Sequence, residues 1–234
     1  MSETRKLAAA LFRRAIERSN EIHAEYLDDP LLCESYDRFT RWQFDYMLPF
    51  FDDLLEPEGY AEAVDFIVSD LAGVGVAERD HDIERATPII VRSLPVHALE
   101  LAASAAELNA GALEFNLAIC RQLLVDGRLP ATITEAEYCL ACREASSFDE
   151  CMGLVNLAVA LGDSLKTLVR VPLIGMLLRT MRAPAHVAGF GALQEFLETG
   201  YLTFRRISDI DHFLVLLHER MDKVFDRIYR LPVE

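Results

Sequence analysis

The chain has 234 residues, of which 52% are hydrophobic, and its formal net charge is −15. One hydrophobic core can hold a chain of this length, and the apolar fraction excludes an intrinsically disordered protein. The negative charge repels phosphate backbones and anionic lipid headgroups, which argues against nucleic acid and membrane surfaces as partners.

Apolar residues recur at helical spacing along almost the whole chain, and no stretch keeps a strict two-residue alternation. We therefore predict an all-α fold, in which a single domain over residues 1–234 forms a bundle of about nine or ten helices. The predicted helices span residues 3–27, 31–55, 58–72, 78–93, 96–125, 134–145, 148–170, 172–181, 184–204 and 208–229.

The N-terminal segment reads as an amphipathic helix and not as a secretion signal. Its apolar stretch runs only from Leu7 to Phe12, and charged residues flank it. The most apolar later stretch, from Met152 to Gly162, is shorter than the roughly 18 to 20 residues that cross a bilayer. We therefore expect no membrane span. Five cysteines without an export signal indicate free thiols in a reducing compartment, which predicts a cytoplasmic protein.

Helix-start signals occur at several of the predicted boundaries. Residue pairs with the spacing of a capping box are Thr134 with Glu137, Ser147 with Glu150 and Ser208 with Asp211. Prolines that fit the first turn of a helix are Pro30, Pro95, Pro172 and Pro184. Between the third and fourth predicted helices, the glycine-containing stretch 71–76 predicts a turn.

The densest polar cluster runs from Glu78 to Arg85 and includes Arg79, Asp80 and Asp82. Its carboxylates, together with a neighbouring histidine, would suit a divalent metal or acid–base chemistry. The alternative is a salt-bridged helix start, because acidic residues in a first turn complement the helix dipole and pair with basic residues one turn away. We favour the salt-bridged helix.

Recognisable cofactor and catalytic motifs are missing. The Glu-x-x-His spacing occurs once, at Glu78 and His81, whereas di-iron bundles carry it on two helices, and no phosphate-binding or nucleophile-elbow motif occurs. Cys139 and Cys142 have redox spacing, but they lie in a predicted helix without a thioredoxin-like context. We expect no metal and no cofactor. A haem or metal carrier that uses His23, His186 or His212 stays open as a third interpretation.

Two stretches are candidates for ligand binding. The aromatic stretch that contains Trp42, Tyr46 and Phe50 covers more than one face of its helix, so it would either line a pocket for an apolar ligand or form packed core. Methionines and leucines between 176 and 181 would close the same space. At the junction of two predicted helices lie three basic side chains that would either bind an anion or cap helix ends: Arg179, Arg182 and His186.

Several segments together resemble a known family. They are residues 63–73, residues 78–85 with Pro88, residues 181–189, and residues 193–200. These segments resemble the proteobacterial FFLEE-motif proteins from about Trp42 to Phe225, although residues 66–70 read FIVSD where that family has FFLEE or FFLED. The resemblance implies a helical cytoplasmic bacterial protein without a known activity. It also singles out positions that would join helices through a polar network: Arg79, Asp80, Asp82, Arg85, Arg182, Pro184, Gln194 and Glu198.

These features favour a non-enzymatic protein that binds a partner protein or an apolar small molecule in a cleft between helices. Partner binding predicts an exposed apolar patch or a homodimer surface, and ligand binding predicts an enclosed cavity. The alternative is an enzyme that takes acid–base residues from the Arg79 to Arg85 stretch and the Arg182 region. That enzyme would need a pocket lined by Asp80, Asp82 or Arg182.

Overall fold

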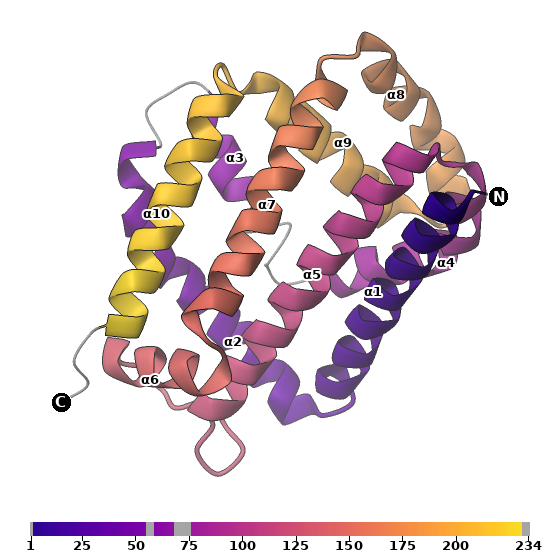
Figure 1. The fold of residues 1–234 in the computed structure, drawn as a ribbon. Helices are drawn as coiled ribbons and strands as arrows, with labels where there is room; N and C mark the ends of the chain where they lie inside the picture. The colour runs from indigo at the N-terminus through magenta and orange to yellow at the C-terminus, as the bar shows by residue number, and fades with distance from the viewer. Residues whose placement is uncertain (1, 55–58, 68–75, 231–234) are drawn as a thin grey trace.

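The computed structural model describes residues 2–54, 59–67 and 76–230. Within these ranges the chain forms ten α-helices and one 3-10 helix, without a strand, packed into a single compact body (Figure 1), which confirms the all-α prediction. The elements are α1 (Glu3–Leu27), α2 (Pro30–Met47), η1 (Leu48–Leu54), α3 (Tyr60–Phe66), α4 (Val76–Ser93), α5 (Val96–Leu123), α6 (Glu135–Ala145), α7 (Phe148–Val169), α8 (Pro172–Val187), α9 (Gly191–Arg206) and α10 (Ile210–Arg230).

Three hydrophobic clusters hold the helices together. The first joins α1, α4 and the first half of α5, where buried alanines such as Ala9, Ala15 and Ala103 let α1 and α5 approach closely. The second joins α2, α6 and the second half of α5 to parts of α7 and α10. The third lies between η1, α3, α9 and the first half of α10. The long helix α5 therefore links the first two clusters.

Helices α8 and α9 form a hairpin at one edge of the body, with α8 outermost (Figure 1). α8 packs mainly against α9 and touches the end of α7. Ile174 and Leu178 carry its inward contacts to the third cluster. The opposite side of α8 faces away from the rest of the molecule.

Helix α7 is long and apolar enough, by length and composition alone, to cross a membrane, and 22% of its most apolar window is buried in this structure. One such helix is weak evidence, because core helices of soluble proteins pass the same test. α7 packs against α5, α9 and α10 and places Cys151, Met152 and Val155 in the second cluster. The absence of a membrane span stays a prediction.

Two helix starts predicted from capping residues are confirmed. The Thr134 hydroxyl accepts a hydrogen bond from the Glu137 amide, and the Glu137 carboxylate accepts one from the Thr134 amide, at the start of α6. Ser147 and Glu150 form the same reciprocal pair at the start of α7. Pro30 and Pro172 lie in the first turns of α2 and α8, as predicted.

Two predicted boundaries near prolines are wrong. The helix predicted over 31–55 ends at Met47 and continues as the 3-10 helix η1, because Pro49 offers no amide to continue the α-helical hydrogen bonding. The predicted break between 181 and 184 does not occur, since Pro184 lies inside α8. The hairpin turn comes later, at Gly189, whose φ of 75° is readily adopted by glycine.

Two smaller predictions also need correction. Pro95 is the residue before α5 and does not lie in its first turn. At the start of α10, the Asp209 carboxylate, and not the Ser208 hydroxyl, accepts the hydrogen bond from the His212 amide at 3.0 Å. Asp209 takes the role because it directly precedes the helix. Residues 68–72 of the predicted third helix and most of the predicted turn over 71–76 lie outside the described residues.

Candidate functional site

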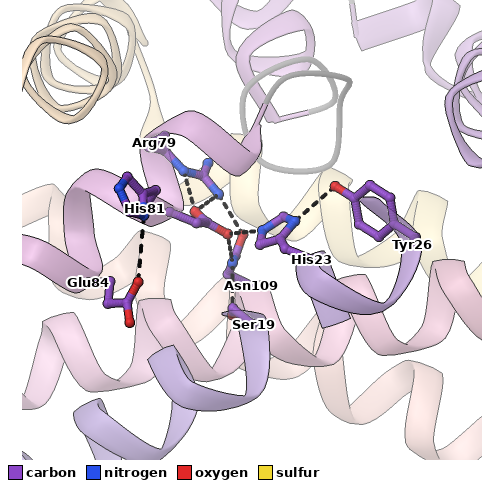
Figure 2. Close-up of polar contacts among 8 residues, drawn as sticks. Ser19, His23, Tyr26, Arg79, His81, Glu84 and Asn109 are labelled. Carbon is purple, nitrogen blue, oxygen red and sulfur yellow. Dashed lines mark hydrogen bonds and ion pairs between the residues drawn. The ribbon is translucent and has the colours of Figure 1, made fainter. Parts of the chain in front are cut away.

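A buried polar network joins α1, α4 and α5 (Figure 2). The Asp80 carboxylate lies at its centre, 2.8 Å from His23 Nε2, and it accepts a hydrogen bond from Asn109 Nδ2 at 2.7 Å. Arg79 pairs with the other Asp80 oxygen at 2.7 Å and donates to the Asn109 side-chain oxygen at 2.7 Å. On its far side the His23 ring contacts the Tyr26 hydroxyl at 2.8 Å.

The environment of Asp80 favours its charged form. Burial opposes the negative charge, but hydrogen bonds from His23 and Asn109 and the charge of Arg79 outweigh it, so the pKa of Asp80 lies below its ordinary value. Asp80 is 2% exposed and Arg79 is 6% exposed. Every carboxylate oxygen of Asp80 is thus engaged by protein groups, which is the arrangement of a structural ion pair.

Asp82 and Arg85 of α4 hold the turn between α8 and α9. The Arg85 guanidinium donates to the carbonyl oxygens of Gly189, at 2.8 Å, and Ala188, at 3.4 Å, and lies over the Phe190 ring. The Asp82 carboxylate accepts a hydrogen bond from the Leu193 amide in the first turn of α9 at 3.3 Å. One helix therefore caps the end of α8 and the start of α9 together.

Further polar contacts tie α8 to α9. Arg182 forms a two-point ion pair with Glu198, at 3.0 and 2.5 Å. The hydrogen bond from Arg182 holds the pKa of Glu198 below its ordinary value, and Arg179 adds to the effect. The buried Gln194 side chain donates to the Leu178 carbonyl oxygen at 2.7 Å. These contacts and the Asp82–Arg85 contacts form a network between helices.

The aromatic residues Trp42 and Tyr46 pack against Tyr138 of α6. Both rings lie edge-on to Tyr138, with ring centroids 5.0 Å apart in each pair, and they stack on each other at 5.4 Å. The Tyr46 hydroxyl donates to Glu135 at 2.9 Å, and Gln43 donates to the Tyr138 hydroxyl at 3.0 Å. These rings therefore fill the space between their helices with their own side chains.

The predicted site residues divide into four groups, of which the fourth is Arg179, Arg182 and His186 on α8. Arg79 and Asp80 lie in the buried network, Asp82 and Arg85 lie at the hairpin turn, and the aromatic residues lie at the second cluster. Phe50 packs against the second and third clusters, and Leu178 packs against the third, whereas Met176, Leu177 and Met181 are exposed. Exposed Arg179 and His186 lie on α8, where the His186 ring is close to Gly191.

Two shallow depressions lie away from all of these groups. One, of about 250 Å³, lies where the ends of α7 and α9 meet, next to Arg170, Tyr201 and Arg205. The other, of about 290 Å³, lies between the start of α2 and the loop before α6. Neither is lined by a predicted site residue. Among the residues whose positions are described, no group of three or more His, Cys, Asp or Glu side chains could hold a metal ion.

His23 and Asn109 are parts of the buried network that the sequence did not assign to Asp80. His23 is 57 positions from Asp80 in the chain, and Asn109 is 29 positions away. A lone histidine or asparagine on a helix gives no signal of its partner, because only the packing of α1, α4 and α5 brings the three together. No single-sequence pattern could have found this contact.

Several large apolar side chains are exposed on the outward side of α8. Leu173, Met176, Leu177 and Met181, which we call the α8 face, lie at positions i, i+3, i+4 and i+8 and so share one side of the helix. Their exposed fractions are 64%, 60%, 53% and 46%. Water therefore contacts an apolar stripe that a soluble protein normally buries.

The structure places the protein in the class of all-α proteins built as one compact helical body. The chain belongs to the family described as Domain of unknown function (DUF8198), which matches residues 23–232. No curated protein and no solved structure matches the chain. The family match includes His23, Asp80, the hairpin turn and the α8 face.

Proposed function

We propose that this protein is a non-enzymatic binding protein that receives a helix of a protein partner on the α8 face. The observation that carries the proposal is the exposure of Leu173, Met176, Leu177 and Met181 as one stripe. Soluble monomers rarely leave several large apolar side chains together in water, and such patches mark interaction sites. The cost of hydrating the stripe is removed when a partner covers it.

The support beneath α8 fits this role. Arg85 and Asp82 hold both sides of the hairpin turn, and the Arg182–Glu198 pair links the two helices. A helix held at its end and along its length presents its outer side in a fixed position, so little conformational entropy is lost when a partner binds. The polar residues shared with the family resemblance thus serve to position the α8 face.

The spacing of the stripe matches helix-on-helix recognition. Amphipathic helices are recognised through residues at i, i+3, i+4 and later turns, which is the spacing from Leu173 to Met181. Met176 and Met181 have flexible, polarisable side chains that adapt to the partner's surface. A partner helix of three to four turns would cover the stripe.

The enzymatic alternative has less support. It needs Asp80, Asp82 or Arg182 to line a pocket, but these side chains are engaged by His23, by the Leu193 amide and by Glu198, respectively. An apolar ligand between Trp42, Tyr46 and Tyr138 has equally little support, because the three rings pack directly on one another.

The proposal places the protein in the cytoplasm of a bacterium, as the resemblance to the FFLEE-motif proteins implies. All five cysteines are free, and four of them are buried. Free buried thiols are typical of reducing compartments, which supports this setting.

Site-specific photo-crosslinking in the native host tests whether the α8 face is covered. A photoreactive phenylalanine analogue replaces Leu177, and in a matched control it replaces Leu140 of α6, which is 47% exposed. We expect a discrete covalent protein adduct from position 177 and none from position 140. If position 177 yields no discrete adduct, or if both positions yield the same ones, the α8 face is not a specific binding surface.

A further inference from the structure

The depression between the ends of α7 and α9 combines apolar and cationic side chains. Its buried lining residues are Val169, Tyr201, Phe204, Ile207 and Ile210. Its exposed lining residues are Arg170, Arg205 and Ser208. No aspartate or glutamate of the described chain is among them. An anion that enters this depression therefore meets two guanidinium groups and no carboxylate in its walls.

The two arginines do not hold helices together. Elsewhere in the chain, arginines donate to carbonyl oxygens at helix ends, as Arg5 does at the end of α4 and Arg85 at the end of α8. Within residues 2–54, 59–67 and 76–230, Arg170 and Arg205 form neither such a bond nor an ion pair. The Arg205 guanidinium lies over the ring of Tyr201, 6.0 Å from its centroid. Both groups thus keep N–H donors for a ligand.

A buried hydroxyl in the wall of the depression also lacks a partner. Tyr201 is 7% exposed, and no group in the described part of the chain forms a hydrogen bond with its hydroxyl. A buried polar group without a partner destabilises the folded state, and native proteins usually satisfy it with protein, water or a bound ion. Tyr201 therefore supplies an unused donor beside the two arginines.

The local charge favours an anion although the whole chain is acidic. The two guanidinium groups carry a charge of +2, and the C-terminal ends of α7 and α9 offset about half a charge each, which leaves about +1. The net charge of −15 is spread over the whole chain. At physiological ionic strength salt screens exposed charges beyond roughly 8 Å, so the arginines dominate inside the depression.

The donor set suits a phosphate group. A phosphate monoester carries a charge of about −1.5 to −2 at neutral pH and has three acceptor oxygens, which matches two arginines and nearby hydroxyls. The volume of about 250 Å³ is smaller than the roughly 300–1,000 Å³ of pockets for drug-sized ligands, so the ligand is small. The apolar lining residues favour an ester with an apolar group over inorganic phosphate.

We infer that this depression binds the phosphate group of a small phosphate ester, with Arg170 and Arg205 as its cationic partners and the Tyr201 hydroxyl as a further donor. None of its lining residues belongs to the α8 face, so the inference goes beyond the proposed function and does not depend on it. A soluble ester and a lipid headgroup share this chemistry, and the experiments below distinguish them.

Isothermal titration calorimetry of the full chain with phenyl phosphate tests the inference, and we expect one site per chain. Arg170→Gln and Arg205→Gln should each weaken binding at least about tenfold, the effect of losing one hydrogen bond between charged groups. Arg14→Gln removes the same charge from an exposed position of α1 and should bind as the wild type does. A wild type that does not bind phenyl phosphate, or an equal loss in all three variants, would overturn the inference.

Tyr201→Phe tests the hydroxyl alone. It should weaken phenyl phosphate binding about two- to tenfold, the range for a neutral hydrogen bond. It should also raise the free energy of unfolding of the ligand-free protein in urea, because the unpaired buried group is gone. A variant that is more stable but binds with wild-type affinity would overturn the assignment of Tyr201 as a donor.

Further probes identify the chemistry and the source of the phosphate. Benzoate presents a carboxylate on the same ring, and binding as tight as that of phenyl phosphate would overturn the choice of phosphate. Phosphatidylcholine vesicles that contain phosphatidic acid test the lipid source. Vesicle binding that Arg170→Gln abolishes and Leu177→Glu leaves unchanged supports the site with a lipid headgroup as its ligand. Binding of phenyl phosphate without vesicle binding supports it with a soluble ester.

Discussion

At the scale of single residues, Asp80 is the side chain whose replacement should cost most. Its buried carboxylate contacts Arg79, His23 and Asn109. Asp80→Asn removes a buried charge that Arg79 and His23 contact directly, so we expect the free energy of unfolding to fall by about 3 kcal/mol. Urea denaturation measures the change, with Asp45→Asn at an exposed position of α2 as the control.

The contribution of Asp80 should also depend on pH. The folded state lowers the pKa of Asp80, so the stabilisation is fully present above the unfolded pKa of about 3.9 and is lost as pH falls through the folded value. The stability difference between wild type and Asp80→Asn should therefore be constant near neutral pH and shrink only below about pH 4. A difference that shrinks between pH 8 and 6 would point to another titrating group.

Gly175 shows how closely α8 approaches α9. A Cβ atom at this position would lie 2.8 Å from the Tyr201 hydroxyl and ring, and Tyr201 is buried. Gly175→Ala should thus destabilise the protein by about 1–3 kcal/mol through overpacking. Gly153→Ala is the matched control, because a Cβ there meets nothing within 4 Å, and alanine should stabilise that helix by about 0.5–1 kcal/mol. Urea denaturation should show a lower free energy of unfolding for Gly175→Ala and a higher one for Gly153→Ala.

At the scale of elements, the hairpin of α8 and α9 depends on a helix that is distant in the chain. Arg85 of α4 donates to carbonyl oxygens at the end of α8. Arg85→Gln shortens the side chain and removes its charge, which should weaken the hydrogen bonds to the end of α8. Amide hydrogen exchange in α8 should therefore become faster. Arg92→Gln makes the same change on an exposed part of α4 and should leave the hairpin unaffected. Equal exchange in the two variants would show that the Arg85 contacts do not hold α8 in place.

The sequence predicted helix starts better than helix ends. Capping boxes at Thr134 and Ser147 are local, since the partner lies three residues away, and both occur where predicted. The predicted end of α8 is wrong because Pro184 signals a break, whereas the helix continues through it to Val187. Local signals identify a boundary only where tertiary packing does not override them.

The candidate site was less predictable than the fold. Asp82 and Arg85 were selected from a charged run, but their partners in the hairpin turn lie more than 100 residues away. Exposure of the α8 face was also not predicted, because an apolar stripe on a helix reads as core until the packing of every other helix is known.

At the scale of the whole molecule, the five cysteines should react very unequally. Cys33 is half-buried, whereas Cys120, Cys139, Cys142 and Cys151 are buried. Burial raises the pKa of Cys120 and Cys142 to about 12, so little thiolate forms at neutral pH. A thiol reagent followed by mass spectrometry should modify one cysteine of the native protein and all five after denaturation. Rapid modification of several cysteines would contradict the described packing.

The four buried cysteines lie in only one of the three hydrophobic clusters, the one between α2, α6 and parts of α5, α7 and α10. The other two clusters contain none. The labelling rate of these four thiols therefore reports how often this cluster opens to the reagent. Arg85→Gln, which should loosen the hairpin, should leave the labelling rate of these thiols at its wild-type value.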